Sequence, residues 1–322
     1  MSAIWSSLSV QENVTNGAAV MLVPLPGESV LTVTGPDSEK FLQGQTSTDF
    51  REVTPTTSRL GCYCNLKGRA TVSFRAVLWQ DSYHLSVDTE LLSLAKNTLQ
   101  KYIIFSKAQL ATPDIAVFGI LGSEAPAFIR QHFGVCPEES DAVANTGEVA
   151  LVRLPGSNRF LVLAKPEKLP ELWEKLTATA PVGSTNDWRL AQIRAGESQV
   201  LAAGSEQFQP QELNLQALNG VSYNKGCYTG QEIVARLYFR GKLKQWVHRF
   251  ALAADALPAI NTPLVTDAGQ TVGHVVMAAH AERGQVELLA VARHDALSGL
   301  HLPENPSELH VLDLPYVVEP RE

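Results

Sequence analysis

Apolar and polar positions along the chain predict two successive units with the same order of elements. In the first unit, the pattern predicts strands over residues 27–33, 58–65, 70–79 and 83–87, with helices over residues 39–45 and 90–102. In the second unit it predicts strands over residues 115–121, 149–153 and 159–163, with helices over residues 125–133 and 169–177. The order strand, helix, strands, helix is typical of an α+β layer and not of a doubly wound parallel sheet.

A different pattern follows these two units. Residues 187–196 predict one more helix, which ends at Gly196. From Trp246 onward, short apolar runs are separated by turn residues at Pro258, Pro263, Gly269 and Gly284, which predicts strands. We therefore expect an α+β region over residues 1–245, made of two units over about 1–110 and 111–245, and an all-β module over residues 246–322.

The charge of the chain is unevenly distributed. The 322 residues include 26 Lys and Arg against 33 Asp and Glu, a formal net charge of −7, which argues against a protein that coats nucleic acid or anionic membrane. Residues 225–249 nevertheless hold six basic residues and one acid, Glu232, so this stretch carries +5 and the rest of the chain −12. Tyr238, Phe239 and Trp246 lie among the cations, which suits RNA bases or a polyanionic tail; a solvated basic face is the alternative.

The N-terminal part of the chain predicts no targeting segment. The first basic residue is Lys40, and the apolar run over residues 18–25 is too short to span a bilayer. Four cysteines in 322 residues are too few for a disulfide scaffold. We expect a cytoplasmic protein that does not contact membranes.

Residues 225–232, with the sequence KGCYTGQE, concentrate reactive and conformationally special side chains. Gly226 and Gly230 predict backbone geometry or close approach that other residues resist. Thr229 is a candidate cap for a helix that starts near Gln231. Cys227 would then lie just before a helix N-terminus and two residues after Lys225, and both features favour its thiolate. The alternative for Cys227 is a small buried hydrophobic residue.

Other candidate sites are weaker. Cys62 and Cys64 lie on one face of a predicted strand and could form a metal site with Cys227, but their spacing is not that of a zinc or cluster motif, so we predict no metal. Asp49 could be a carboxylate in a cleft or the cap of a short helix, and capping is the more common role.

The octapeptide, with residues 234–236 and 240–242 after it, resembles the signature of the YgfZ family. The resemblance extends through residues 35–49, 101–107, 188–196 and 210–218. It implies a ring of two ferredoxin-like α+β units and a C-terminal β-barrel around a folate cleft, similar to the glycine-cleavage T-protein. It also implies a folate-binding accessory protein that supports iron–sulphur cluster maintenance and, indirectly, tRNA-thiolating enzymes.

The resemblance also implies roles for individual residues. Cys227 becomes the reactive thiol, with Lys225 as the residue that primes it. Trp188 becomes a flat apolar platform for tetrahydrofolate or a derivative; a core tryptophan is the alternative. The remaining expected folate contacts are Glu28, Tyr228, Gln231, Glu232 and Arg236, with Gly226 and Gly230 as the glycines of the motif.

Two departures from the T-protein pattern change the expected chemistry. T-proteins carry an aspartate pair after a Gly-rich turn, whereas residues 70–73 here are Ala, Thr, Val and Ser. Without that carboxylate we expect no aminomethyltransferase activity. Arg194 replaces an acid that meets the pterin in relatives, so that contact is left to another group such as Glu197. A one-carbon transferase with a non-standard acid and a protein that binds tRNA directly are the alternative functions.

Overall fold

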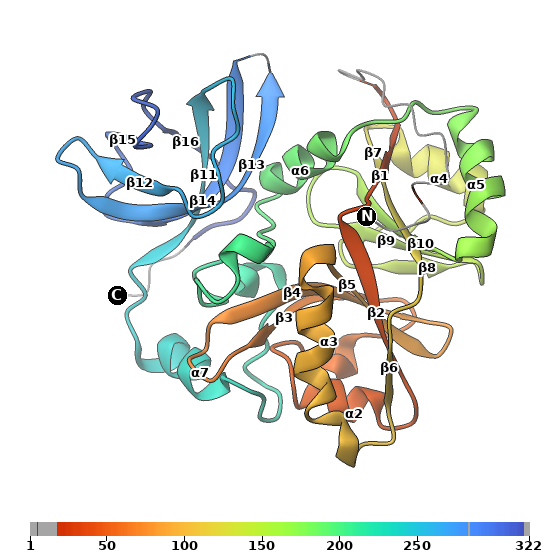
Figure 1. The fold of residues 1–322 in the computed structure, drawn as a ribbon. Helices are drawn as coiled ribbons and strands as arrows, with labels where there is room; N and C mark the ends of the chain where they lie inside the picture. Colours follow the sequence, from red (N-terminus) through yellow and green to blue (C-terminus); the bar gives the residue numbers. More distant parts are fainter. Residues whose placement is uncertain (1–4, 6–17, 283, 319–322) are drawn as a thin grey trace.

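The structure is a computed structural model that describes residues 5, 18–282 and 284–318, and in this part of the chain it contains three sheets (Figure 1). The first sheet has the order β3-β4-β5-β2-β6, with strands Arg59–Cys64, Ala70–Trp79, Ser82–Asp88, Glu28–Thr34 and Gln109–Ala111. The second has the order β1-β7-β10-β9-β8, with strands Met21–Pro24, Ala116–Leu121, Arg159–Ala164, Val149–Leu154 and Val143–Asn145. The third has the order β15-β12-β13-β14-β11-β16, with strands Leu300–His301, Pro263–Thr266, Thr271–Glu282, Gln285–Arg293, Gln245–Ala253 and His310–Leu312.

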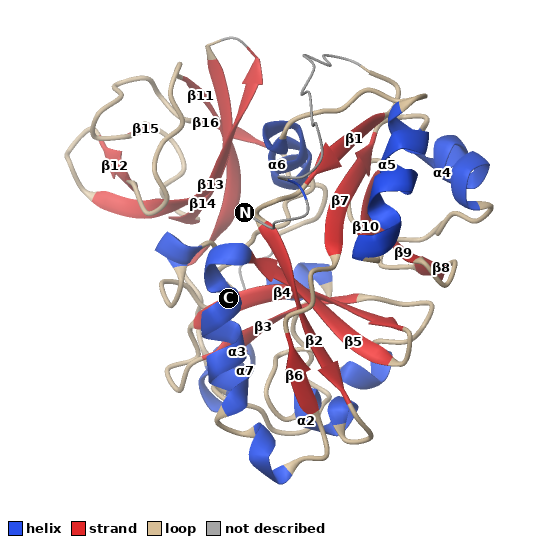
Figure 2. Cartoon of the chain, turned by 45° about the vertical axis from the view of Figure 1, so that its right-hand side comes forward, coloured by secondary structure: helices blue, strands red, loops and turns tan. Residues whose placement is uncertain are grey.

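Six helices complete the described residues: α2 (Ser38–Gln43), α3 (Leu92–Gln100), α4 (Ala125–Phe133), α5 (Leu169–Thr177), α6 (Thr185–Arg194) and α7 (Gln231–Arg240). Helices α4 and α5 cover one face of the second sheet (Figure 2). Helix α6 lies between the second and third sheets, where it contacts β1, β13 and β14. Every pair of named strands is antiparallel, so the α+β prediction is confirmed.

The second sheet is buried on both faces. In β7, Phe118 and Ile120 pack on the side of α4 and α5, while Val117 and Leu121 pack on the opposite side with residues of the first sheet such as Val30. Successive side chains of a strand point to opposite faces, so both apolar faces appear in one continuous apolar run. The two sheets therefore share a hydrophobic interface, and the candidate site lies beside it.

The predicted secondary structure agrees with most of these elements. Helices α4 and α5 have the predicted bounds, and the predicted strands of both units and of the all-β module are present. The run over residues 18–25 contributes β1, a strand that the pattern did not predict. No helix in the described residues is both long and apolar enough to cross a membrane. The segment before residue 18, where no targeting signal is predicted, lies outside the described residues except for residue 5.

Two segments pair or pack with parts of the chain that are distant from them in the sequence. Strand β1 pairs with β7 and so belongs to the second sheet. Residues 200–234 return to the first unit, where Leu215, Tyr228 and Val234 join its core. This return brings the KGCYTGQE octapeptide onto the first unit, beside the turn between β3 and β4.

Candidate functional site

A cavity lies between the first sheet, the second sheet and α6. Its volume is about 40 Å³. Polar and aromatic side chains dominate its lining, which includes Glu28, Ser73, Arg75, Ser86, Arg159, Trp188, Gln192 and Glu197. Glu28 and Trp188 are two of the predicted folate contacts, so the structure brings these two together. Among the described residues, those that line the cavity do not include the other predicted site residues Lys225, Cys227, Tyr228, Gln231, Glu232 and Arg236.

Trp188 is fixed by the start of α6. Ser184 Oγ accepts a hydrogen bond from the backbone N–H of Asp187, and Asp187 Oδ2 accepts one from the backbone N–H of Ser184 at 2.7 Å. The Arg159 guanidinium carbon lies 5.3 Å from the centre of the indole ring. Gly119 leaves room for the ring, because a Cβ at that position would lie 2.3 Å from two indole carbons. Trp188 therefore belongs both to the core between the sheets and to the cavity wall.

Four buried charges form an ion network in the same wall. Arg75 Nη1 lies 2.5 Å from Asp141 Oδ1, and Arg75 Nη2 lies 3.3 Å from Glu197 Oε2. Arg159 Nη2 lies 2.6 Å from that same oxygen of Glu197. Burial would raise the pKa of Glu197, but the two guanidinium groups outweigh it and hold this pKa below its usual value. The network is neutral as a whole, which is what allows four charges to lie at least nine-tenths buried.

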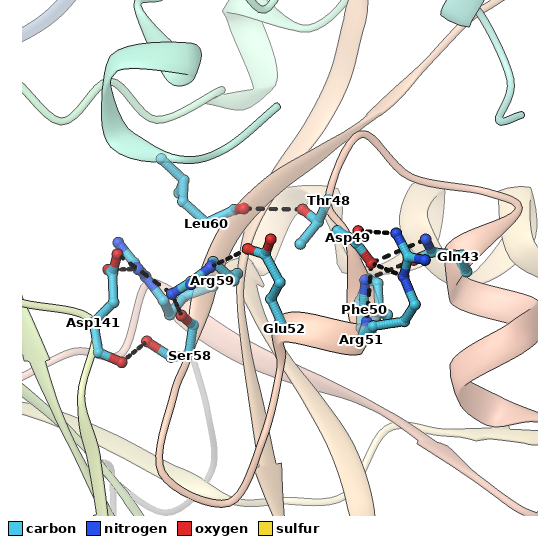
Figure 3. Close-up of polar contacts among 11 residues, drawn as sticks. Gln43, Thr48, Asp49, Phe50, Arg51, Glu52, Ser58, Arg59, Leu60 and Asp141 are labelled. Carbon is cyan, nitrogen blue, oxygen red and sulfur yellow. Dashed lines mark hydrogen bonds and ion pairs between the residues drawn. The ribbon is translucent and has the colours of Figure 1, made fainter. Parts of the chain in front are cut away.

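A second contact set holds Asp141 in place. Its backbone oxygen accepts hydrogen bonds from the Ser58 backbone N–H at 2.7 Å and the Ser58 hydroxyl at 3.0 Å (Figure 3). Arg59, the next residue, pairs with Glu52 at 2.9 Å and approaches the Asp141 carboxylate at 3.9 Å. These contacts connect β3 of the first unit to the segment before β8 of the second unit, so the network also joins the two units.

Two N–H donors of the network have no acceptor. Arg75 Nε and Arg159 Nη1 are buried and make no hydrogen bond with any described residue. An unpaired buried donor costs about 1–3 kcal/mol.

Glu28 adds a carboxyl group to the cavity. It accepts hydrogen bonds from Ser86 Oγ at 2.7 Å and from Gln199 Nε2 at 2.6 Å. Burial raises the pKa of Glu28 in spite of these two donors. Glu28 and Glu197 are the carboxyl groups among the described lining residues.

The two departures from the T-protein pattern have clear positions. Ser73 lies in the cavity wall, where its Oγ accepts a hydrogen bond from the Val200 backbone N–H at 2.8 Å, so β4 supplies no carboxylate. Arg194 does not line this cavity; its Nη2 pairs with Glu287 Oε1 of β14 at 2.7 Å. Glu197 does line it, with its carboxylate held by two arginines.

Lys225 of the octapeptide is buried. Its Nζ donates hydrogen bonds to the backbone oxygens of Thr46 at 2.6 Å and Thr48 at 2.5 Å. It also lies 5.0 Å from the centre of the Tyr228 ring. Burial lowers the pKa of Lys225 to about 7. The Lys225 ammonium therefore bonds to the backbone of the first unit, and no hydrogen bond joins it to Cys227.

Cys227 is exposed and free, and it makes no hydrogen bond or ion pair with a described residue. The prediction that Thr229 caps α7 is wrong: Gly230 is the N-cap residue, at φ +81°, and no side chain caps the helix. Gly230 is required there, because a Cβ would lie 2.5 Å from the Asn65 backbone oxygen. The expectation that position 226 also requires glycine is wrong. There φ is not positive, and a Cβ would meet no atom within 4 Å.

The other expected folate contacts, in the octapeptide and on α7, divide between core and surface. Tyr228 is buried, and its backbone N–H donates to Gln231 Oε1 at 3.2 Å. Glu232 and Arg236 are exposed on α7. The expected roles of these four residues in folate binding stay predictions.

The three cysteines of the metal alternative lie in different surroundings. Cys62 and Cys64 are buried with their Sγ atoms 3.7 Å apart, whereas Cys227 is exposed. No group of three metal-ligating side chains forms among the described residues.

Asp49 caps a short helix, as the sequence predicts. Its carboxylate accepts from the Arg51 backbone N–H at 3.1 Å, from Arg51 Nε at 2.8 Å and from Gln43 Nε2 at 3.0 Å (Figure 3). The hydrogen bond from the Arg51 side chain is the largest contribution that lowers the pKa of Asp49 to about 2. The carboxylate is therefore engaged by its own turn.

Comparison with known proteins defines the fold. No model of a known protein family matches the chain. The glycine cleavage system aminomethyltransferase T from Bartonella henselae superposes with a TM-score of 0.76, over 94% of this chain and 88% of that chain, at 15% sequence identity. A heterotetrameric sarcosine oxidase from Corynebacterium sp. U-96 matches 49% of this chain and 82% of that chain, with a TM-score of 0.36 and 14% identity. The chain therefore has the fold of the glycine-cleavage T-protein, while the resemblance to the YgfZ family stays a prediction.

Proposed function

We propose that the chain binds a folate, as tetrahydrofolate or a derivative, at the mouth of the cavity beside Trp188. The observation that carries this proposal is a cavity wall that presents the Trp188 indole beside the buried guanidinium groups of Arg75 and Arg159. A pterin ring has a flat face for the indole, carbonyl and ring-nitrogen acceptors for the arginines, and an amino group for Glu28. The fold shared with a glycine cleavage aminomethyltransferase supports the same ligand class.

The residues of the cavity fit binding better than aminomethyl transfer. Tetrahydrofolate, when bound, would supply N5 and N10 as carriers of one-carbon units. Residues 70–73 of β4 offer no carboxylate for proton relay, and Glu197 is held between two cations. We infer that Arg75 and Arg159 orient the ring, Trp188 covers one of its faces, and no residue of β4 moves a proton. We also propose that the two units are ferredoxin-like and that the ring arrangement implied by the family resemblance applies to this chain.

Calorimetric titration with tetrahydrofolate and 5-formyltetrahydrofolate tests folate binding. We expect Trp188→Leu to weaken binding at least tenfold, because the flat aromatic face is removed while an apolar side chain remains. Trp173→Leu is the matched control, since Trp173 is similarly buried but packs on the far face of the second sheet. Absence of heat with every folate, or equal affinity of the wild type and Trp188→Leu, would contradict the proposal.

We further propose that Cys227 serves the maintenance of iron–sulphur proteins, among them tRNA-thiolating enzymes. Its exposed thiol, free of hydrogen bonds and ion pairs within the described chain, supports a role toward another molecule. In a deletion strain we expect the wild-type chain to restore tRNA thiolation and Cys227→Ser to restore less than a tenth of it. Cys136→Ser, which changes another free thiol, should restore it fully. Equal rescue by both variants would remove Cys227 from the function.

A further inference from the structure

The segment after β16 crosses from the third sheet to the residues that follow α6. It begins beside β11, where Arg249 Nη1 donates a hydrogen bond to the Asp313 backbone oxygen at 3.2 Å. Leu314 and Tyr316 then pack, half-buried, against the core of the first unit. We call residues 313–318, the last that the structure describes, the C-terminal strap. The strap therefore joins the all-β module to the region that carries the candidate site.

Tyr316 binds the strap to the C-terminal end of α6. Its Oη donates a hydrogen bond to the Gly196 backbone oxygen at 2.6 Å and accepts one from Asn214 Nδ2 at 3.4 Å. Gly196 has a φ of +64°, and a Cβ at this position would lie 2.8 Å from a carbon of the Tyr316 ring, so glycine permits the close approach. Burial raises the pKa of Tyr316 to about 12, so the phenol remains a donor at neutral pH.

The hydrogen bond from Tyr316 holds the peptide unit that leads into Glu197. The oxygen of this unit belongs to Gly196 and its N–H belongs to Glu197, and the N–H donates to the Gln192 backbone oxygen at 3.1 Å. Because a peptide unit is planar, holding both its oxygen and its N–H restricts the direction in which the Glu197 side chain leaves the backbone. The strap and α6 therefore hold this peptide unit from two sides.

The Glu197 carboxylate links this peptide unit to the cavity wall. It pairs with Arg159 at 2.6 Å, and the Arg159 guanidinium group lies over the indole of Trp188. We propose that Tyr316 is a positioning residue for the folate site: through the Gly196–Glu197 peptide it holds the Glu197 carboxylate against the guanidinium group that lies over the indole. The inference rests on the proposed function, because it gives the folate site of the α+β region a residue from the C-terminal module.

Tyr316→Phe tests the proposal, because it removes the hydroxyl and keeps the ring. The first readout needs no ligand: in protein labelled with fluorotryptophan, the fluorine resonance assigned to Trp188 through Trp188→Leu should move, while that of Trp173 on the far face of the second sheet stays in place. The second readout is calorimetric titration with 5-formyltetrahydrofolate, in which affinity should fall about two- to tenfold, as expected for one hydrogen bond. Tyr223→Phe is the matched control: it removes another half-buried phenol hydroxyl, bonded to Gln216 Oε1 at 3.0 Å, and should change neither quantity.

A double-mutant cycle with Glu197→Gln tests the route of this effect. Because residues that act through one another are not additive, Tyr316→Phe should move the Trp188 resonance less in the Glu197→Gln background than in the wild type. A Trp188 resonance that does not move, a wild-type folate affinity in Tyr316→Phe, or an equal shift in both backgrounds would overturn the proposal, since Tyr316 would then only stabilise the strap. If the wild type binds no folate while the Trp188 resonance still moves, the proposed function fails and the positioning of Glu197 by Tyr316 stands.

Discussion

Replacing Glu197 with glutamine is expected to lower the free energy of unfolding by about 3 kcal/mol. The carboxylate is the shared partner of Arg75 and Arg159, and both guanidinium groups would keep their charge in a buried site. Removing one partner of a buried ion pair costs about 3–5 kcal/mol, because the remaining charge is left uncompensated. The glutamine amide keeps the size of the side chain, so the loss of stability reports charge and not a cavity.

Urea unfolding followed by circular dichroism measures this difference. The control is Glu138→Gln, which breaks the pair with Arg130, a pair whose side chains are 75% and 53% exposed. Exposed pairs contribute about 0–1 kcal/mol, so the control should shift little. Similar small shifts for both variants would show that the buried network contributes no more than a surface pair.

Lys225→Met is expected to remove a rise of stability with pH. The pKa of Lys225 is lowered to about 7 by burial, whereas an unfolded lysine keeps a pKa near 10.4. Between these values the unfolded chain binds one more proton than the folded chain, so the free energy of unfolding rises with pH. The slope amounts to about 1.4 kcal/mol per pH unit from roughly pH 7.5 to 9.5.

Denaturant unfolding of the wild type and the variant at several pH values isolates this contribution. Only the difference in slope is interpreted, because the methionine also leaves the backbone oxygens of Thr46 and Thr48 without their donor at every pH. Lys101→Met, a change at an exposed lysine, should keep the wild-type slope. A wild-type slope in Lys225→Met as well would mean that Lys225 is charged in the folded state.

Local signals in the sequence were enough to predict most elements. Helix α5 shows an apolar face at Leu169, Trp173 and Leu176, and its predicted bounds are confirmed. Strand β1 was missed because a short apolar run without alternation is equally typical of a loop that becomes buried. Its identity as a strand depends on pairing with β7, which lies in a distant part of the sequence.

The site could be predicted only in part. Resemblance to a family pointed to Trp188 and Glu28, and both line the cavity. Arg75 carries a signal in the sequence, since it is a charge within the apolar strand over residues 70–79. Arg159 and Glu197 could not be assigned to the site from the sequence, because their pairing exists only once three distant segments meet. The conformation of residues 226–230 is likewise set by contact with the turn between β3 and β4, which the sequence does not display.

The position of β1 has a consequence for synthesis on the ribosome. Met21 pairs with Leu121, so the strand that emerges early must wait for about 100 further residues before its partner exists. At 5–20 residues per second, that delay is about 5–20 s. During this time the neighbouring strands β2 to β5 can already form most of the first sheet, while β1 remains an apolar strand without a partner. Chaperones that act on nascent chains are therefore expected to bind the segment around residues 20–25 until β7 is complete.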